Sequence, residues 1–248
     1  MFFKPIKFLT MIFFSIENSL EPKILGHYPQ VKDIKQNCDV WNEPRFIEHV
    51  IFTAIDFEPI TANAILYASS NLTDLISVTG MGFTRKMLVS GKLKKIIQES
   101  RRNGIEFYPS HLVYKNEVIE DYWVSNSFEI DMDFIDIKKS NIVWRKRKQE
   151  GGTFLSDIKF DSLDEFITKI EEENLEGKLY LNKIEIKEEV DTDFFTLLNV
   201  EGGVKYVVSE KLKKEIEDAS CTGIEFMPVG LTLNEWLHGE REKIYGKA

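Results

Sequence analysis

Two glutamates hold the same place in a repeated stretch of the sequence. Glu106 lies in "GIEFYP", and Glu225 lies 119 residues later in "GIEFMP". If the two copies pack about a pseudo-twofold axis, the carboxyl groups approach each other, and such a pair can share a proton for general acid–base catalysis. The alternation of apolar and polar residues offers a simpler explanation, because a half-buried strand turns every second side chain to solvent. The sequence therefore favours two solvent-facing carboxylates and leaves open a hydrolase that uses Glu106 and Glu225.

Other polar clusters lack the spacing of a catalytic or metal site. The acids of "DMDFID", Asp131–Asp136, lack the glycine and the terminal glutamate of a calcium loop, so we expect the solvated face of a strand. The two cysteines form no CxxC pair, which disfavours zinc and a disulfide framework and favours a reducing compartment. We therefore expect no catalytic residue, no metal ligand and no cofactor. The histidines show no ligand spacing: His27, His49, His111 and His238.

The charge of the chain is unevenly distributed. The net charge is −9, and residues 1–150 sum to about +1 while residues 151–248 sum to about −10. Such an acidic part repels phosphates, which disfavours nucleic acid and favours a basic protein partner, although solubility alone is an equally simple reason for it. The dense basic run "RKRK", Arg145–Lys148, indicates an exposed loop more than a nucleic-acid patch.

A repeat must position these groups. "SGKLKKIIQESRRNGIEFYP", Ser90–Pro109, recurs as "SEKLKKEIEDASCTGIEFMP", Ser209–Pro228. The two copies align without an insertion or deletion. Over residues 86–109, 13 of 24 positions are identical in residues 205–228. Helix signals alone do not require Gly-Ile-Glu-Phe-x-Pro to recur, so the agreement indicates duplicated structure.

Each copy carries the signals of a helix between two strands. Ser90 and Ser209 are predicted N-caps, because a serine hydroxyl accepts from the free amides of the first turn. Gly104 and Gly223 are expected to end the helices in the left-handed conformation. Residues 86–109 and 205–228 are each expected to be a strand–helix–strand unit. The other residues that carry the pattern are the stripe Leu93, Ile96 and Ile97, its counterpart Leu212, Ile216 and Ala219, the strand residues Phe107 and Phe226, and the terminal Pro109 and Pro228.

The remaining segments predict an α+β fold in which the two units pack in a mixed or antiparallel sheet. "SLDEFITKIEEENL" predicts a helix with a capping box of Ser162 and Glu165, and "VIEDYWVSNSFEIDMDFIDI" predicts one or two strands. A further strand is expected within Lys178–Ile186. Trp144–Phe154 predicts a loop, which divides the chain into parts 1–150 and 151–248 unless the whole forms one compact domain.

The N-terminal run resembles the start of a secretory signal, with Lys4 and Lys7 before apolar residues. It lacks a small-x-small cleavage site and is too short to span a bilayer. We therefore expect no membrane association and interpret "MIFFSIE" as a strand that opens the fold. Met1 and Met11 both remain possible native starts.

The stretch from about Thr73 to Val229 resembles a family of immunity proteins from bacterial polymorphic toxin systems, typified by a myxobacterial member. The family pattern is a serine that opens a helix, a Gly-[Ile/Val]-Glu-Phe-x-Pro strand, an aromatic pair near "DYW", an Asp followed by Lys-Ser, and a second serine–helix–glycine unit. The matching residues are Ser90, Leu93, Gly104, Ile105, Glu106, Phe107, Pro109, Tyr122, Trp123, Asp136, Lys139 and Ser140, followed by Ser209, Leu212, Gly223 and Phe226.

The resemblance implies a cytoplasmic, non-enzymatic protein that neutralises a cognate toxin by binding it. Toxins that act on nucleic acids are often basic, and carboxylates presented where phosphates would lie raise the association rate. The acidic "KEEVDTD" is therefore the expected interface, and the region around Tyr122 and Trp123 is the next candidate. A regulatory module that binds a small ligand between the two units stays open beside the hydrolase. The candidate toxin contacts are Glu188, Glu189, Asp191 and Asp193.

Overall fold

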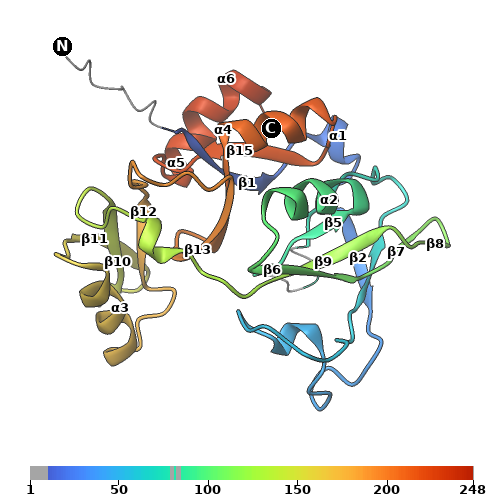
Figure 1. Cartoon of the computed structure of the whole chain (residues 1–248), viewed down its shortest axis with the longest axis horizontal. Coiled ribbons are helices and arrows are strands. Elements are labelled where there is room, and N and C mark those ends of the chain that lie inside the picture. The colour runs from blue at the N-terminus through green and yellow to red at the C-terminus, as the bar shows by residue number, and fades with distance from the viewer. Residues whose placement is uncertain (1–10, 79–80, 82–84, 248) are drawn as a thin grey trace, which may run out of the picture.

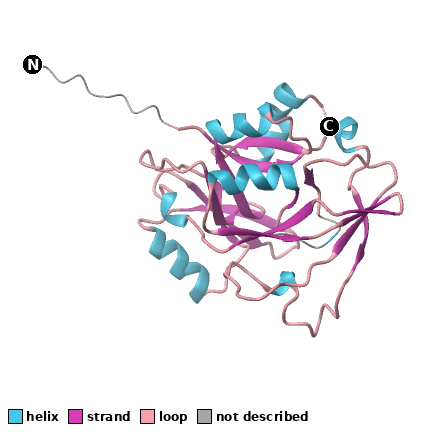
Figure 2. Cartoon of the chain, turned by 45° about the vertical axis from the view of Figure 1, so that its right-hand side comes forward, coloured by secondary structure: helices cyan, strands magenta, loops and turns pink. Residues whose placement is uncertain are grey.

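The computed structural model describes residues 11–78, 81 and 85–247. These residues form three β-sheets with helices packed around them, which confirms the α+β class (Figures 1 and 2). The signal-like run before Met11 and most of the glycine turn at residues 80–83 lie outside the described residues. Among the described helices none is long and apolar enough to cross a membrane.

The largest sheet has seven strands in the order β11-β10-β12-β13-β14-β1-β15. The predicted opening strand is confirmed as β1, which lies between two strands from the C-terminal part, antiparallel to both (Figure 1). The strands are β1 (Phe13–Asn18), β10 (Asn141–Arg147), β11 (Thr153–Ile158), β12 (Leu179–Lys183), β13 (Phe194–Val200), β14 (Gly203–Ser209) and β15 (Ile224–Pro228).

Two four-stranded sheets are built from the first half of the chain. One has the order β2-β3-β7-β8, and the other has the order β4-β5-β9-β6. The strands are β2 (Val31–Lys35), β3 (Asn63–Leu66), β7 (Leu112–Tyr114) and β8 (Glu117–Ile119), then β4 (Leu75–Ile76), β5 (Leu88–Ser90), β6 (Ile105–Pro109) and β9 (Tyr122–Ser127).

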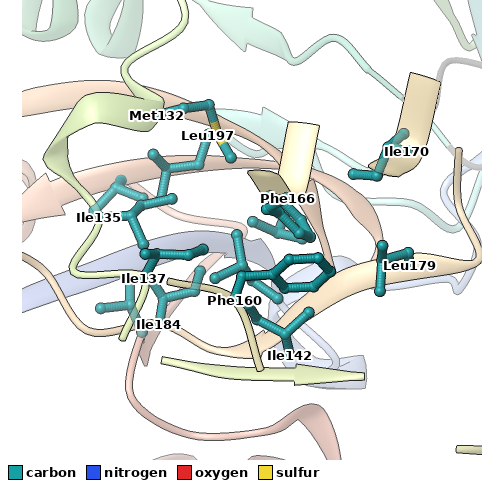
Figure 3. Packing of buried hydrophobic residues seen from close by; sticks show 14 of the residues in the cluster. Met132, Ile135, Ile137, Ile142, Phe160, Phe166, Ile170, Leu179, Ile184 and Leu197 are labelled. Carbon is teal, nitrogen blue, oxygen red and sulfur yellow. The ribbon is translucent and has the colours of Figure 1, made fainter. Parts of the chain in front are cut away.

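The helices cover the sheets and contribute apolar stripes to their cores. Phe166 and Ile170 of the predicted helix point into a core with Phe160, Ile142 and Leu179 from the large sheet and its loops (Figure 3). The helical segments are α1 (Pro22–Leu25), η1 (Ile47–His49), α2 (Gly91–Ser100), η3 (Met132–Phe134), α3 (Leu163–Glu172), α4 (Glu210–Asp218), α5 (Leu233–Glu235), η4 (Trp236–Glu240) and α6 (Arg241–Tyr245).

The two predicted strand–helix–strand units are confirmed as β5-α2-β6 and β14-α4-β15. Each unit takes up a third, antiparallel strand between its own two, β9 in the first unit and β1 in the second. A further antiparallel strand flanks each unit, giving β4-β5-β9-β6 and β13-β14-β1-β15. Helices α2 and α4 contact each other, and both units share one core that includes Leu93, Ile97, Leu212 and Ile216. The duplication therefore extends to whole four-stranded layers.

The expectation that Gly104 and Gly223 end the helices is wrong, because α2 ends at Ser100 and α4 at Asp218, and both glycines instead precede the strands β6 and β15.

The predicted loop at Trp144–Phe154 is wrong. β10 and β11 form a hairpin from Ile142 opposite Ile158 to Arg147 opposite Thr153, so the loop shrinks to the turn that contains Gly151 and Gly152. Five residues, 148–152, connect the strands, and both glycines have positive φ, a conformation that glycine adopts without steric cost. The dense charge of the basic run predicts a loop. Most of its lysine and arginine side chains lie instead on a strand with exposed positions, where charged side chains do not oppose β-structure. The proposed boundary at residue 150 falls in this turn.

Candidate functional site

The two repeated glutamates have different surroundings. Glu106 in β6 is half-buried and accepts a hydrogen bond from the hydroxyl of Tyr108. Glu225 in β15 is 1% exposed, and the Nε and Nη2 atoms of Arg241 donate to its carboxylate at 2.6 and 2.7 Å. The expectation that both carboxylates face solvent is wrong for Glu225, because α6 places a buried arginine against it. Each carboxylate has its own partner, and the printed sequence around it does not distinguish the two.

The serine N-caps are confirmed in both units. Ser90 Oγ accepts from the backbone N–H of Leu93 at 3.3 Å, and Ser209 Oγ accepts from that of Leu212 at 3.2 Å. Each hydroxyl donates in turn to an aspartate at 2.6 Å, to Asp74 in the first unit and to Asp193 in the second. The sequence contains the signal for these supporting acids, since "TDLIS" and "TDFFT" precede the two serines at the same spacing.

Asp193, predicted to contact a toxin, therefore also supports the start of α4. Lys211 forms an ion pair with it at 2.6 Å, as Lys92 does with Asp74 at 3.2 Å. Burial raises the pKa of Asp193, but hydrogen bonds from Lys211 and Ser209 outweigh burial and bring the pKa below its ordinary value. Its side chain is thus engaged within the fold.

The other three predicted contacts lie on an exposed segment with two buried anchors: Glu188 and Glu189 precede Val190, and Asp191 follows it. Glu188, Glu189 and Asp191 are exposed, whereas Ile184 and Val190 are 2% and 7% exposed. Figure 3 shows Ile184 pointing into the same core as Ile135 and Ile137. Ile184 and Val190 therefore fix the segment in the core while the three carboxylates are exposed.

The Asp136, Lys139 and Ser140 motif holds this segment. The Ser140 hydroxyl accepts from the backbone N–H of Glu185 at 3.0 Å, and the Asp136 N–H donates to the Glu185 carbonyl at 2.8 Å. Lys139 forms an ion pair with Asp136 at 3.0 Å, which raises the pKa of Lys139, as do the nearby carboxylates of Glu188 and Glu185. The same pair lowers the pKa of Asp136. We call Asp136, Glu185, Glu188, Glu189 and Asp191 the acidic surface.

The expected strand at Asp131–Asp136 is wrong. The segment contains η3, and Met132 in it and Ile135 directly after it are buried at a spacing of three residues. Asp131 accepts from Arg101 Nη1 at 2.7 Å and from the backbone N–H of Thr196 at 2.9 Å. It links the end of α2 to β13, a structural role.

The aromatic pair of the family pattern is also engaged within the fold. Tyr122 is buried, its hydroxyl donates to the Thr73 carbonyl at 2.8 Å, and burial raises its pKa. Trp123 is half-buried and donates to Asp121 at 3.2 Å. The ammonium of Lys94 lies 3.0 Å from the centre of the Trp123 ring, a cation–π contact.

A polar cavity that sequence analysis missed lies between η1 and the start of β5. Lys86 is 9% exposed, and its Nζ donates to the Val50 carbonyl at 2.9 Å and to Asn126 Oδ1 at 3.2 Å. Burial raises the pKa of Glu48 to about 7, and Lys86 only partly opposes this shift. Glu48 Oε1 is buried without a hydrogen-bond partner among the described residues. The volume is about 170 Å³, and the lining residues are Glu48, Val50, Ile51, Phe52, Arg85, Lys86 and Ser127.

Replacing Glu48 by glutamine is expected to stabilise the protein at pH 8 by about 1–2 kcal/mol. The unfolded chain ionises this carboxyl near its ordinary pKa, whereas the folded chain resists ionisation until about pH 7, so the wild type loses stability as pH rises between these values. The gain should disappear near pH 4, where both states hold the proton. Denaturant melts of both proteins across this range measure it, and a gain that does not vary with pH would contradict it.

Comparison with known proteins decides the family. A model described as the immunity protein family Imm11 matches residues 13–230, most of the chain. The chain belongs to the Imm11 immunity protein family. This Imm11 match ends before α5, so Arg241, the buried partner of Glu225, lies outside the matched region. No curated protein matches the chain. Among the described residues, no group of three His, Cys, Asp or Glu side chains is placed to hold a metal ion.

Proposed function

We propose that this Imm11 protein is a cytoplasmic immunity protein of a polymorphic toxin system, which neutralises a cognate toxin by direct binding and without catalytic turnover. The observation that carries the proposal is the family match over residues 13–230. Two free cysteines suit a reducing compartment. The chemistry of the fold adds support, because the carboxylate of Glu225 is occupied by Arg241, the Leu20 N–H and the Ser19 hydroxyl.

The acidic surface is the proposed docking site for a basic face of the toxin. Apart from Asp136, which bonds to Glu185 through the backbone, its carboxylates lie on a segment that Ile184 and Val190 anchor in the core. Little chain entropy is therefore lost when a partner binds. Asp193 lies two residues beyond Asp191 and completes the segment, although its carboxylate also supports α4. Like-signed charges gathered on one face attract an oppositely charged partner over about one Debye length.

Reversing the charge of Glu188, Glu189 and Asp191 to lysine is expected to lower the association rate constant with the toxin by about 10- to 100-fold at low salt. The difference should shrink as salt increases, because screening removes the attraction in the wild type. Asp193 is left intact so that the α4 cap is retained. Stopped-flow or surface-based kinetics at two salt concentrations measure the effect.

The matched control reverses Glu171, Glu172 and Glu173 at the end of α3, which are also exposed. This control changes the net charge of the protein by the same amount at another place. Equal rate losses in both variants would show that overall charge, and not the acidic surface, steers the toxin. Protection of cells that express the toxin, measured for the wild type, tests the immunity function itself.

A further inference from the structure

The duplicated fold allows Lys86, in the polar cavity, to be compared with an equivalent lysine in the second unit. Lys86 and Lys205 occupy the same place in the repeat. Lys86 lies two residues before the start of β5, and Lys205 lies within β14. In the second unit, Lys205 forms an ion pair with Glu17 of β1 at 2.9 Å. In the first unit, the corresponding residue of β9 is Asn126, as the register shows: Glu225 pairs with Glu17, and Glu106 pairs with Asn126.

Among the described residues, Lys86 therefore lacks the ion-paired acid that its counterpart has. Burial lowers the pKa of Lys86, and the nearby Glu48 opposes this shift without forming an ion pair. The two hydrogen bonds of Lys86 go to the neutral oxygens of Val50 and Asn126, and among the described residues it forms no ion pair. An ammonium group has three donors, so one N–H remains beyond these two. A buried charge that lacks a hydrogen-bonded opposite partner is costly, and such a group indicates a place where a ligand supplies that partner.

The cavity beside Lys86 has room for that ligand. Its volume of about 170 Å³ is close to that of a cavity that accepts a benzene-sized molecule. Val50, Ile51 and Phe52 give it an apolar side, and Arg85 adds a second cation. One guanidinium nitrogen of Arg85 bonds to Glu176, which leaves other N–H donors of this group without a bond among the described contacts.

We propose that this cavity binds a small carboxylate with a short apolar tail. The carboxylate accepts hydrogen bonds from Lys86 and Arg85, and the tail contacts Val50, Ile51 and Phe52. Glu48, whose Oε1 atom has no hydrogen-bond partner among the described residues, takes up a proton and donates it as a hydrogen bond to the bound carboxylate. The ligand is either a free molecule or an aspartate or glutamate side chain of another protein.

The charged groups around Glu48 set the direction of the pH dependence. Lys86 and Arg85 share the cavity with it, Tyr206 lies near enough for Glu48 to raise its pKa, and Glu176 is paired with Arg85. The pKa of Glu48 is about 7 in the free protein, so above this pH its carboxyl group is mostly ionised. Binding of the carboxylate ligand then requires Glu48 to take up a proton, which lowers the affinity. Affinity is therefore expected to fall by about tenfold from pH 6 to pH 8.

The proposal is tested by titrating the full chain with butyrate and with benzoate. Binding is monitored by NMR chemical-shift changes of the protein and by the midpoint of its thermal unfolding. Saturable binding with a dissociation constant on the order of 1 mM is expected for at least one of the two acids, with no binding of benzamide. N-acetylaspartate amide represents a protein side chain, and its affinity relative to butyrate shows which source the cavity prefers. No saturable binding of any of the three acids, or equal binding of benzamide, overturns the proposal.

The variant Asn126→Asp restores the missing acid without removing the lysine. It is expected to weaken carboxylate binding by at least about tenfold, because Lys86 then has an internal partner. Lys205→Met alters the equivalent lysine and should leave binding unchanged, and thermal melts confirm that both variants fold. Should Asn126→Asp lose the fold with its bond to Thr53, Lys86→Met provides the second test. Wild-type affinity in a folded Asn126→Asp or Lys86→Met variant overturns the assignment.

Discussion

Replacing Glu225 by glutamine is expected to destabilise the protein by about 3–5 kcal/mol, since one half of a buried ion pair is removed. Arg241 is 1% exposed and would keep its charge without the carboxylate that receives two of its hydrogen bonds. The carboxylate also accepts from the N–H of Leu20 at 2.8 Å, so the change weakens the link between β1 and β15 as well. Glu21, 3.9 Å from Arg241, offers a partial substitute and favours the lower end of the range. Chemical denaturation measures the loss.

Glu106→Gln is the matched control, because this glutamate lies at the same place in the other unit. Its carboxylate is half-buried and bonds to Tyr108, so the expected cost is below about 1 kcal/mol. Replacing both members of the buried pair, Glu225 by leucine and Arg241 by methionine, should recover much of the loss. An equal loss of unfolding free energy in Glu225→Gln and Glu106→Gln would contradict the argument that the buried ion pair stabilises the fold.

The contrast between these glutamates shows what the local sequence determines. Gly-Ile-Glu-Phe-x-Pro predicts a strand after a left-handed glycine in both units, and the structure confirms both strands. The same letters do not distinguish a half-buried carboxylate from a buried one. The difference comes from Arg241, 16 residues beyond Glu225, in a helix whose pattern was not recognised. Burial of a strand face depends on the segment that packs on it, and that segment can lie far away in the sequence.

Units that share local signals were therefore predictable, whereas sites made by distant segments were not. Ser90 and Ser209 each cap a helix by accepting a hydrogen bond from a residue only three positions away, so the local sequence predicts both caps. The polar cavity joins Glu48 to Lys86 and Ser127, which no spacing rule connects. One clue was present, since Lys86 and Lys205 are identical within the repeat. Their different partners became visible only when the register placed Asn126 and Glu17 at the same position.

Gly223→Ala is expected to cost about 3 kcal/mol, and Gly104→Ala about 1–2 kcal/mol. Both glycines have positive φ, 82° and 88°, which costs an alanine about 1 kcal/mol in either unit. An added Cβ at Gly223 would lie 2.4 Å from the carbonyl oxygen of Leu75, a backbone atom held in β4. At Gly104 the nearest atoms are the ends of two side chains and not backbone: Glu129 is exposed, whereas Arg101 is buried and bonded to Asp131.

Gly151→Ala separates the conformational cost from the steric cost. This glycine has φ of 93° in the β10–β11 turn, and no atom of the described residues, other than those of Gly151 and its chain neighbours, lies within 4 Å of the position of an added Cβ. Its replacement should therefore cost about 1 kcal/mol, the conformational part alone. The expected order of destabilisation is Gly223→Ala, then Gly104→Ala, then Gly151→Ala, measured by denaturant melts of all three. If Gly223→Ala and Gly151→Ala show the same loss of stability, the contact between Gly223 and β4 relaxes easily. The core shared by the two units would then be less rigid than the backbone bond from Leu75 N–H to the Thr222 carbonyl, at 3.2 Å, indicates.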